Sequence, residues 1–230
     1  MNRRSVLKNL NANKKTKVED KTNIEKLIEK LKVNSQPVTV PVIPETYSKE
    51  LQCYYNVEQK IEKDGGKIHY GWNIHQLATL IEGEHHAVWE NDKGELIDIT
   101  PNQDRTTEIL FCSDEKTTYS GVNIGNIRMN ITDNKMVDDI ILFYETNDLF
   151  WTYGERKDEE VVNMPTIIVK MIESFNGVIY QLEQQVKKGD NHNSLCVCGS
   201  GKIYSKCHSV LLKNDRLQYI KEAKKIKSKM

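Results

Sequence analysis

The sequence lacks any long apolar run. Its first twenty residues, MNRRSVLKNLNANKKTKVED, are positively charged but contain no apolar segment of signal-peptide length. No later window approaches the roughly 18 apolar residues that cross a bilayer. Hydrophobic residues make up 38% of the chain, which is low to ordinary for a soluble protein. We therefore expect a cytoplasmic protein without membrane contact, with room in 230 residues for one substantial domain and a small module.

Cysteine is scarce and unevenly distributed. Three of the five cysteines lie between residues 196 and 207. A domain of this size can bury a core without disulfides, and in a reducing cytosol clustered cysteines serve more often as metal ligands than as bridges. The cluster therefore predicts a ligand set.

Net charge is also absent, since 33 basic residues balance 33 acidic ones. The balance hides an asymmetry: residues 1–35 carry a net charge of +6 and residues 211–230 carry +5, which leaves −11 on the middle. Basic ends of this kind contact RNA, ribosomes or acidic partners, or serve solubility alone. No aromatic interleaving or nucleic-acid motif accompanies the lysines.

The pattern of the chain predicts four parts and no internal repeat. We expect a basic N-terminal arm with a short helix over residues 1–37, an α+β domain over 38–190, a zinc module over 194–209 and a basic helix over 210–230. The α+β domain is predicted to hold an antiparallel sheet with packed helices. Its elements are a helix from about Ser48 to Lys63, strands within 67–90, 95–100 and 105–131, and helices near 134–151 and 165–187.

The stretch CVCGSGKIYSKCH spaces its ligands as Cys196-x-Cys198, eight residues, then Cys207-His208. Three thiolates and one imidazole match the closed tetrahedral set of a structural zinc site. A redox dithiol would more often show C-x-x-C, and a phosphate-binding loop would need glycine at 196 and serine or threonine at 203. The spacing therefore favours zinc.

This stretch resembles the SEC-C motif, the zinc-binding module at the C-terminus of the SecA translocase ATPase that is also appended to many bacterial proteins. The resemblance includes all four ligand positions and both glycines, and departs from the usual pattern at Ile203, where a basic residue is commoner. It implies zinc, and it implies a docking element for partners such as the SecB chaperone and the ribosome. The alternative is that zinc serves only to fold the tail.

A second candidate site combines Cys53, His86 and Asp98. Cys53 lies near the start of a predicted helix, where the amide dipoles favour a thiolate. A histidine on one strand and an aspartate on the next would complete a nucleophile, a base and an orienting group.

Which histidine faces Asp98 depends on the turn at NDKG. A two-residue loop would put His85 on the face of Asp98, whereas a three-residue loop with Gly94 in the left-handed conformation puts Val88 opposite Asp98 and His86 on its face. The second turn also gathers an apolar face of Ala87, Trp89, Ile97 and Ile99. We therefore expect His86 to be the base.

The order of these residues resembles transglutaminase-like and papain-like cysteine enzymes. The segment from Leu51 to Pro101, with C-x-x-N-V, Y-G-W, E-x-x-H-A-V-W and D-I-T-P, more closely resembles an uncharacterised bacterial and phage group that often carries SEC-C tails. The chain departs from ordinary transglutaminases because only 32 residues separate Cys53 from His86 and Trp89 follows His86 by three positions. The alternative is a structural role, with Cys53 as a small buried hydrophobe.

The leading hypothesis is a cytoplasmic zinc-binding protein whose SEC-C module docks to a protein partner of chaperone or ribosome type. Two alternatives stay open. One is a cysteine hydrolase or amide transferase of the transglutaminase-like kind, and the other is an RNA- or ribosome-associated protein that uses its basic ends.

Overall fold

The computed structural model describes residues 21–102, 105–156 and 162–228. Helices make up 42% of these described residues and strands 23%, which confirms the mixed class with an antiparallel sheet. The helices are α2 (Lys21–Leu31), α3 (Cys53–Asp64), α4 (Lys135–Trp151), α5 (Thr166–Lys187) and α6 (His208–Lys227), with a short 3-10 turn, η1 (Tyr204–Lys206). The strands are β1 (Val38–Pro41), β2 (Lys67–Gln76), β3 (Leu80–Glu90), β4 (Leu96–Ile97), β5 (Glu108–Ser113), β6 (Ile127–Asn130), β7 (Glu155–Arg156) and β8 (Val162–Asn163).

The main sheet is antiparallel and closes on itself. Its strands follow the order β1-β5-β2-β3-β4, and β6 pairs with the far end of β3. The edges β1 and β4 then meet, because Val42 forms a parallel bridge with Asp98 just beyond each strand. The Ile43 N–H donates to the carbonyl of Asp98 over 2.8 Å, and the Asp98 N–H donates to Pro41 over 2.9 Å. At this bridge, the outer edge of β1 and the outer edge of β4 are neighbours.

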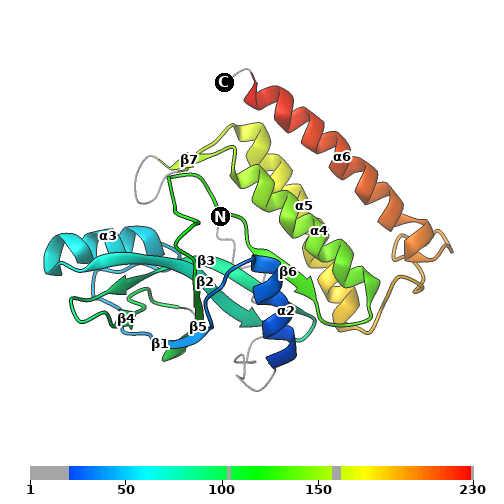
Figure 1. Ribbon diagram of the computed structural model, residues 1–230. Coiled ribbons are helices and arrows are strands. Elements are labelled where there is room, and N and C mark those ends of the chain that lie inside the picture. Colours follow the sequence, from blue (N-terminus) through cyan, green and yellow to red (C-terminus); the bar gives the residue numbers. More distant parts are fainter. Residues whose placement is uncertain (1–20, 103–104, 157–161, 229–230) are drawn as a thin grey trace.

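Two helices cover the sheet at different places (Figure 1). Helix α3 packs Val57 against Ala87 and Ile99 on the outer face of β3 and β4. Helix α2 packs Ile24 and Leu27 near the start of β3 and the end of β2. This is the short helix predicted within the N-terminal arm, while residues 1–20 of that arm lie outside the described residues.

The inside of the closed sheet is filled by side chains from the opposite face of its strands. Val40, Val88 and Phe111 form its buried centre. The ring of Phe111 lies over Gly71, where an added Cβ would come within 2.4 Å of the ring carbon. A larger residue at 71 would therefore displace the ring that fills this centre.

The helix that carries Cys53 begins later than the sequence pattern predicted. We expected it to start near Ser48, but Leu51 has a φ of 65°, which a right-handed helix cannot contain. The helical conformation therefore begins only after Leu51, and Cys53 becomes the first residue of α3. This places the thiol at the positive end of the helix dipole.

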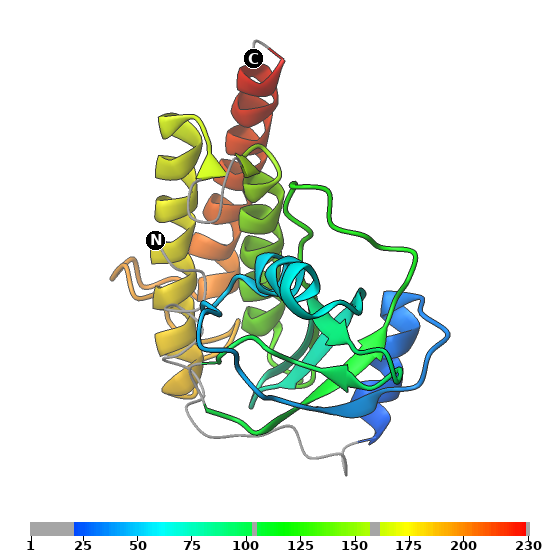
Figure 2. The same ribbon diagram turned by 90° about the vertical axis from the view of Figure 1, so that its left-hand side faces the viewer.

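The C-terminal part of the chain, from α4 onward, is a helical unit beside the sheet. In Figure 2, α4 and α5 run side by side, and α6 lies along them. Phe143 of α4 stacks on Phe175 of α5, and Tyr219 of α6 meets the edge of Phe175. The apolar core of this unit extends to Cys196 and Tyr204 of the cysteine loop.

A buried ion cluster joins the sheet to the helices. Arg128 of β6 contacts Glu82 of β3 and Asp148 of α4, both at 2.7 Å, and its side chain is 3% exposed. Its guanidinium carbon also lies 4.7 Å from the centre of the Tyr144 ring. Since three elements share one buried cation, displacing α4 would leave charges unpaired in the interior.

The predicted division at residues 38, 190, 194 and 210 stays a prediction, while the apolar core described above extends from α4 across the cysteine loop to α6. No helix among residues 21–102, 105–156 and 162–228 is long and apolar enough to cross a membrane.

Glu183 is a carboxyl group buried between α4 and α5. It is fully buried and accepts a hydrogen bond from the Tyr144 hydroxyl, while its other oxygen has no partner among the described residues. Burial raises the pKa of Glu183 to about 8, although the bond from Tyr144 opposes the rise. The carboxyl is therefore largely neutral at pH 7.

This burial predicts a pH-dependent stability. The folded pKa of about 8 lies above the ordinary 4.5, so the folded state binds the proton more tightly. The stabilisation of the fold by this bound proton is complete below about pH 4.5 and is lost as the pH rises through 8. We expect the neutral variant Glu183→Gln to be more stable than the parent at pH 9 by on the order of 3 kcal/mol. Urea titrations from pH 5 to pH 9 measure this difference.

The matched control is Glu173→Gln, on the exposed face of the same helix. It should leave the pH profile of the unfolding free energy unchanged. A Glu183→Gln profile that runs parallel to that of the parent would contradict the buried neutral carboxyl.

Candidate functional site

The structure brings the four predicted metal ligands together in the loop between α5 and α6. The ligand atoms of Cys196, Cys198, Cys207 and His208 all lie within 4.8 Å of one another. The Sγ atoms of Cys198 and Cys207 are 3.6 Å apart, and the Nδ1 atom of His208 lies 3.0 Å from Cys196 Sγ and 3.5 Å from Cys207 Sγ. Two thiolates on a tetrahedral ion at bond lengths of about 2.3 Å would be about 3.8 Å apart. The set therefore fits one tetrahedral metal ion.

The backbone of this loop is shaped by two glycines. Gly199 and Gly201 have φ angles of 74° and 71°, in the left-handed region that other residues rarely adopt. A Cβ at either position would meet nothing within 4 Å, so glycine is required by conformation rather than by space. The loop closes where the Cys196 N–H donates to the carbonyl of Lys202 over 2.8 Å.

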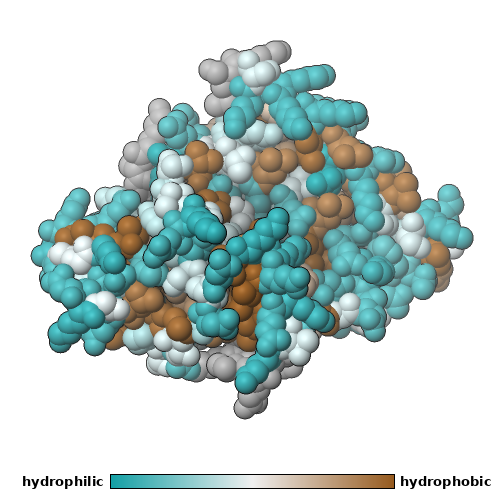
Figure 3. Space-filling model, viewed as in Figure 1, coloured by the Kyte–Doolittle hydropathy of each residue, from teal (hydrophilic) through white to brown (hydrophobic). Residues whose placement is uncertain are grey.

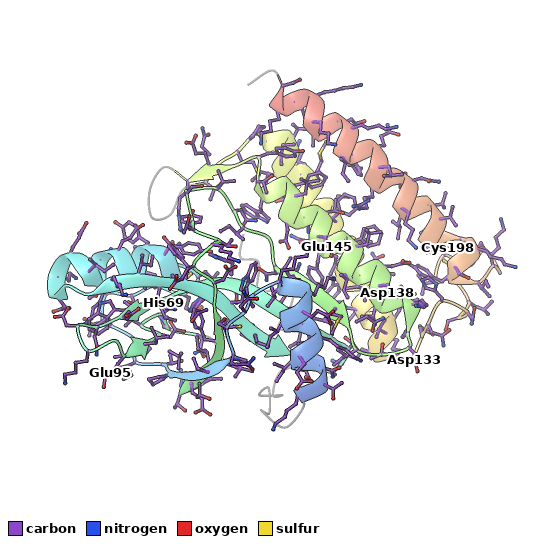
Figure 4. All side chains as sticks on the ribbon, in the orientation of Figure 1. His69, Glu95, Asp133, Asp138, Glu145 and Cys198 are labelled. Atoms are coloured by element: carbon purple, nitrogen blue, oxygen red, sulfur yellow. The ribbon has the colours of Figure 1, made fainter. Side chains whose placement is uncertain are left out.

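The first two cysteines of the loop differ in their electrostatic surroundings. Cys198 is exposed, and hydrogen bonds with the hydroxyl and backbone of Ser200 lower its pKa to about 6. Burial raises the pKa of the Cys196 thiol. Since the thiolate is the form that binds metals, Cys198 is prepared as a ligand even before an ion arrives. It lies beside the first turn of α6 (Figure 4).

A single buried carboxylate ties the loop to α4. Asp139 is 2% exposed and receives four groups from the C-terminal segment. Its Oδ2 lies 3.0 Å from the ring of His192 and accepts from the hydroxyls of Tyr204 at 3.1 Å and Ser209 at 2.7 Å, and its Oδ1 pairs with Lys213 at 2.7 Å. The metal loop is therefore bound to the domain from both of its sides.

The sequence prediction missed Asp139, although a signal was present. In KMVDDIILFY it lies three residues after Met136 and four before Phe143, both fully buried, so it falls on the apolar face of a helix. A carboxylate on that face needs partners in the interior. Those partners lie 53 to 74 positions away in the sequence. The pattern therefore indicates that Asp139 needs partners but does not indicate which residues they are.

The turn between β3 and β4 takes the conformation that selects His86. Gly94 has a φ of 78°, and the Asn91 N–H donates to Glu95 over 3.1 Å, which closes a three-residue loop. Trp89 pairs with Ile97, so Val88 lies opposite Asp98 as predicted. The predicted apolar face of Ala87, Trp89, Ile97 and Ile99 is present under α3.

His86 and Asp98 form a buried pair. His86 Nε2 lies 3.1 Å from Asp98 Oδ2, and the two side chains are 6% and 3% exposed. The contact has ion-pair distance, but the ring nitrogen is not aligned for a hydrogen bond with any described residue. The other carboxylate oxygen, Oδ1, accepts from the backbone N–H of Thr100 over 2.9 Å. Asp98 is therefore held on one side and faces the imidazole on the other.

Cys53 is the second group, after Asp98, that influences the charge of the same imidazole. Burial lowers the pKa of His86, but the charges of Asp98 and then of Cys53 outweigh it, so this pKa lies well above its ordinary value. Cys53 itself is 8% exposed. The structure thus brings together the three residues that the sequence suggested, from α3, β3 and the segment after β4.

His85 has a different role, on the outer face under α3. Its Nδ1 lies 2.8 Å from the hydroxyl of Tyr54 and its Nε2 lies 2.9 Å from the carbonyl of Thr117. Burial lowers the pKa of His85, so the neutral ring donates to Thr117 and accepts from Tyr54. Both nitrogens are occupied, and His85 joins α3 to the loop that carries Thr117.

Comparison with known proteins identifies only the metal loop. The family model for the SEC-C motif matches residues 193–209. No curated protein and no solved structure matches the chain. The resemblance of the central segment to the bacterial and phage group, and to transglutaminase-like or papain-like enzymes, therefore stays a prediction.

The anchor at Asp139 predicts a large loss of stability when it is removed. Asp139→Ala leaves four donors without their shared acceptor, all of them on buried or half-buried residues, and we expect a loss of about 3 kcal/mol in the free energy of unfolding. Denaturant titration of the metal-loaded chain measures it. The adjacent Asp138, on the exposed side of α4 (Figure 4), is the matched control, and Asp138→Ala should cost less than about 0.5 kcal/mol. Equal losses for the two variants would refute the anchor.

Proposed function

We propose that this chain is a cysteine-dependent hydrolase or acyl transferase, with Cys53 as nucleophile, His86 as general base and acid, and Asp98 as the group that orients His86. The observation that carries the proposal is the convergence of these three side chains from separate elements at a buried position. A carboxylate, an imidazole and a thiol at a helix start form the constellation of thiol nucleophiles.

The arrangement supports a two-step reaction. The Cys53 thiol proton passes to His86, which gives a thiolate beside an imidazolium, and the sulfur then attacks a carbonyl carbon of an amide or ester. The tetrahedral intermediate then collapses to a thioester as His86 returns the proton to the departing amine or alcohol. Water completes a hydrolysis by attacking the thioester carbon, and an acceptor amine completes a transfer in the same way. His86 takes the proton of the attacking water or amine, and the C–S bond breaks to release the Cys53 thiolate.

The start of α3 would stabilise the oxyanion. Backbone N–H groups in the first turn of a helix point toward a negative charge placed at its N-terminus. Gln52 precedes Cys53, and its side-chain oxygen accepts a hydrogen bond from Arg156 of β7. This contact leaves the Gln52 amide nitrogen as the end that would donate to an oxyanion.

The raised pKa of His86 agrees with this role. An imidazole that keeps its proton at neutral pH stabilises a thiolate beside it, as in thiol enzymes whose cysteine and histidine form an ion pair. Asp98 stabilises the charged ring from the other side.

The proposal predicts an activated thiol. The rate of Cys53 alkylation by iodoacetamide in the folded, metal-loaded chain should already be near its plateau at pH 6.5. In His86→Ala the rate at this pH should fall at least about tenfold, because an ordinary thiol with a pKa near 8.5 is only about 1% thiolate there. Mass spectrometry of the Cys53 peptide measures the rate between pH 5 and pH 9.

His75→Ala is the matched control, because His75 lies on β2 with a partly exposed side chain that pairs with Glu84 at 3.3 Å. It should leave the alkylation profile unchanged. If the parent chain reacts like a free cysteine across the whole range, the enzymatic proposal is wrong.

A second candidate function is docking through the metal loop, with zinc as the bound ion. Three thiolates and one imidazole are a ligand set that zinc prefers in structural sites. Large apolar side chains surround the loop: Leu195 is 69% exposed, Val197 65%, Val210 51% and Leu211 53%. Figure 3 shows hydrophobic surface at the right-hand end of the molecule, where this loop lies in Figure 1. Exposed apolar side chains on a rigid loop favour a protein partner.

RNA contact by the basic ends stays a prediction with less support. Residues 1–20 lie outside the described residues, and two basic side chains of α6 serve the fold: Lys213 pairs with Asp139, and Arg216 donates to Thr146. The predicted cytoplasmic location also stays a prediction.

The docking proposal predicts one zinc ion per chain and a partner that depends on it. Elemental analysis should find about one equivalent of zinc in the parent chain and in Cys112→Ala, a buried cysteine outside the loop, but much less in Cys207→Ala.

The zinc-loaded chain should sediment with ribosomes. Leu195→Ser with Val197→Ser should weaken this association at least about tenfold, because two apolar side chains lose their contact area.

Val38→Ser, which alters an exposed apolar residue on β1, is the matched control and should sediment like the parent. Ribosome association that survives both zinc removal and the double substitution would exclude docking by the metal loop.

A further inference from the structure

Asn56 forms a buried connection between the helix that carries Cys53 and the segment that carries Asp98. Its side chain is 2% exposed, and its amide nitrogen donates to the hydroxyl oxygen of Thr100 over 3.1 Å. Thr100 is itself 5% exposed. The two residues lie 44 positions apart, so this hydrogen bond is a purely tertiary contact.

The connection continues to the imidazole. The backbone N–H of Thr100 donates to Asp98 Oδ1 over 2.9 Å, which leaves Oδ2 facing His86 at 3.1 Å. A continuous series of contacts therefore leads from Asn56 through Thr100 and Asp98 to His86. Every member is buried, so water does not compete for these contacts.

The position of Asn56 on α3 relates this series to the thiol. Asn56 lies three residues after Cys53, so both side chains project from the same side of the first helical turn. Anchoring Asn56 to Thr100 therefore sets both the rotation of α3 and the height of its first turn above Asp98. The distance between the thiol and the imidazole depends on these two quantities.

Asn56 also holds the chain that leads into α3. Its oxygen accepts from the Lys49 N–H over 3.0 Å, and its nitrogen donates to the Lys49 carbonyl over 2.9 Å. These two bonds would by themselves fix the loop before the helix. The third bond, to Thr100, does nothing for that loop and acts only between the helix and the segment of Asp98.

We propose that Asn56 and Thr100 are positioning residues that align Cys53 with the His86 and Asp98 pair through their mutual hydrogen bond. This inference rests on the proposed thiol chemistry. It adds two residues that touch neither the substrate nor the sulfur, and it assigns the catalytic geometry to one buried hydrogen bond across the site.

The decisive variant is Thr100→Val, which deletes the accepting oxygen and keeps the branched shape. Its Cys53 alkylation rate at pH 6.5 should fall at least about tenfold below that of the parent, with the pH profile moving toward that of an ordinary thiol near pKa 8.5. Thr100→Ser keeps the oxygen and should restore the parent profile. Asn56→Ala, which deletes the donor, should behave like Thr100→Val.

Asn147→Ala separates alignment from stability. Asn147 is 5% exposed and donates to Asn176 over 2.8 Å within the helical unit. Its removal should lower the melting temperature about as much as Thr100→Val does, yet leave the alkylation profile unchanged.

The outcomes distinguish the positioning role of Asn56 and Thr100 from the proposed enzymatic function. An activated thiol in the parent that persists in both Thr100→Val and Asn56→Ala would overturn the positioning role while leaving the enzymatic proposal intact. A parent thiol without activation would overturn both. A shift of the profile in Thr100→Val, with recovery in Thr100→Ser, would support the inference.

Discussion

The closure of the sheet at Asp98 is the constraint on which the thiol site depends. The backbone of Asp98 bonds on both sides to the segment of β1, through Pro41 and Ile43, and this bridge joins the two edges of the sheet. The backbone is held from both sides, and Oδ1 accepts from the Thr100 N–H, so Oδ2 faces His86. The same residue thus completes the architecture and orients the candidate base.

A second buried carboxylate organises the other half of the molecule. Asp139 gathers His192, Tyr204, Ser209 and Lys213 from the segment around the cysteine loop. A buried charge stabilises a fold only when its partners compensate for its lost hydration, and four donors meet that condition here. The metal loop is consequently held against the core of the helical unit. Since the Arg128 cluster fastens α4 to the sheet, the candidate docking surface and the candidate thiol site belong to one connected framework.

Much of this arrangement was predictable where the chemistry is local. The metal ligands lie within thirteen residues, so their types and spacing already define a tetrahedral set. The choice of His86 over His85 followed from one turn, because a glycine able to take a positive φ at 94 decides the pairing of two strands. The start of α3 was misplaced because the left-handed backbone at Leu51 has no signal in residue type, leucine being an ordinary helix former.

The sequence by itself determined the ligand set, the mixed α+β class and the strand register that selects His86, because each depends on residue types a few positions apart. Only the tertiary structure decided that Asp139 anchors the metal loop, that Thr100 connects Asn56 to Asp98, and that the two edges of the sheet meet at Val42. Apart from the local bond between Thr100 and Asp98, these contacts join residues 44 to 74 positions apart. Such pairs are selected by the packing of whole elements, and a buried polar side chain in the sequence shows that a partner is needed without showing which residue supplies it.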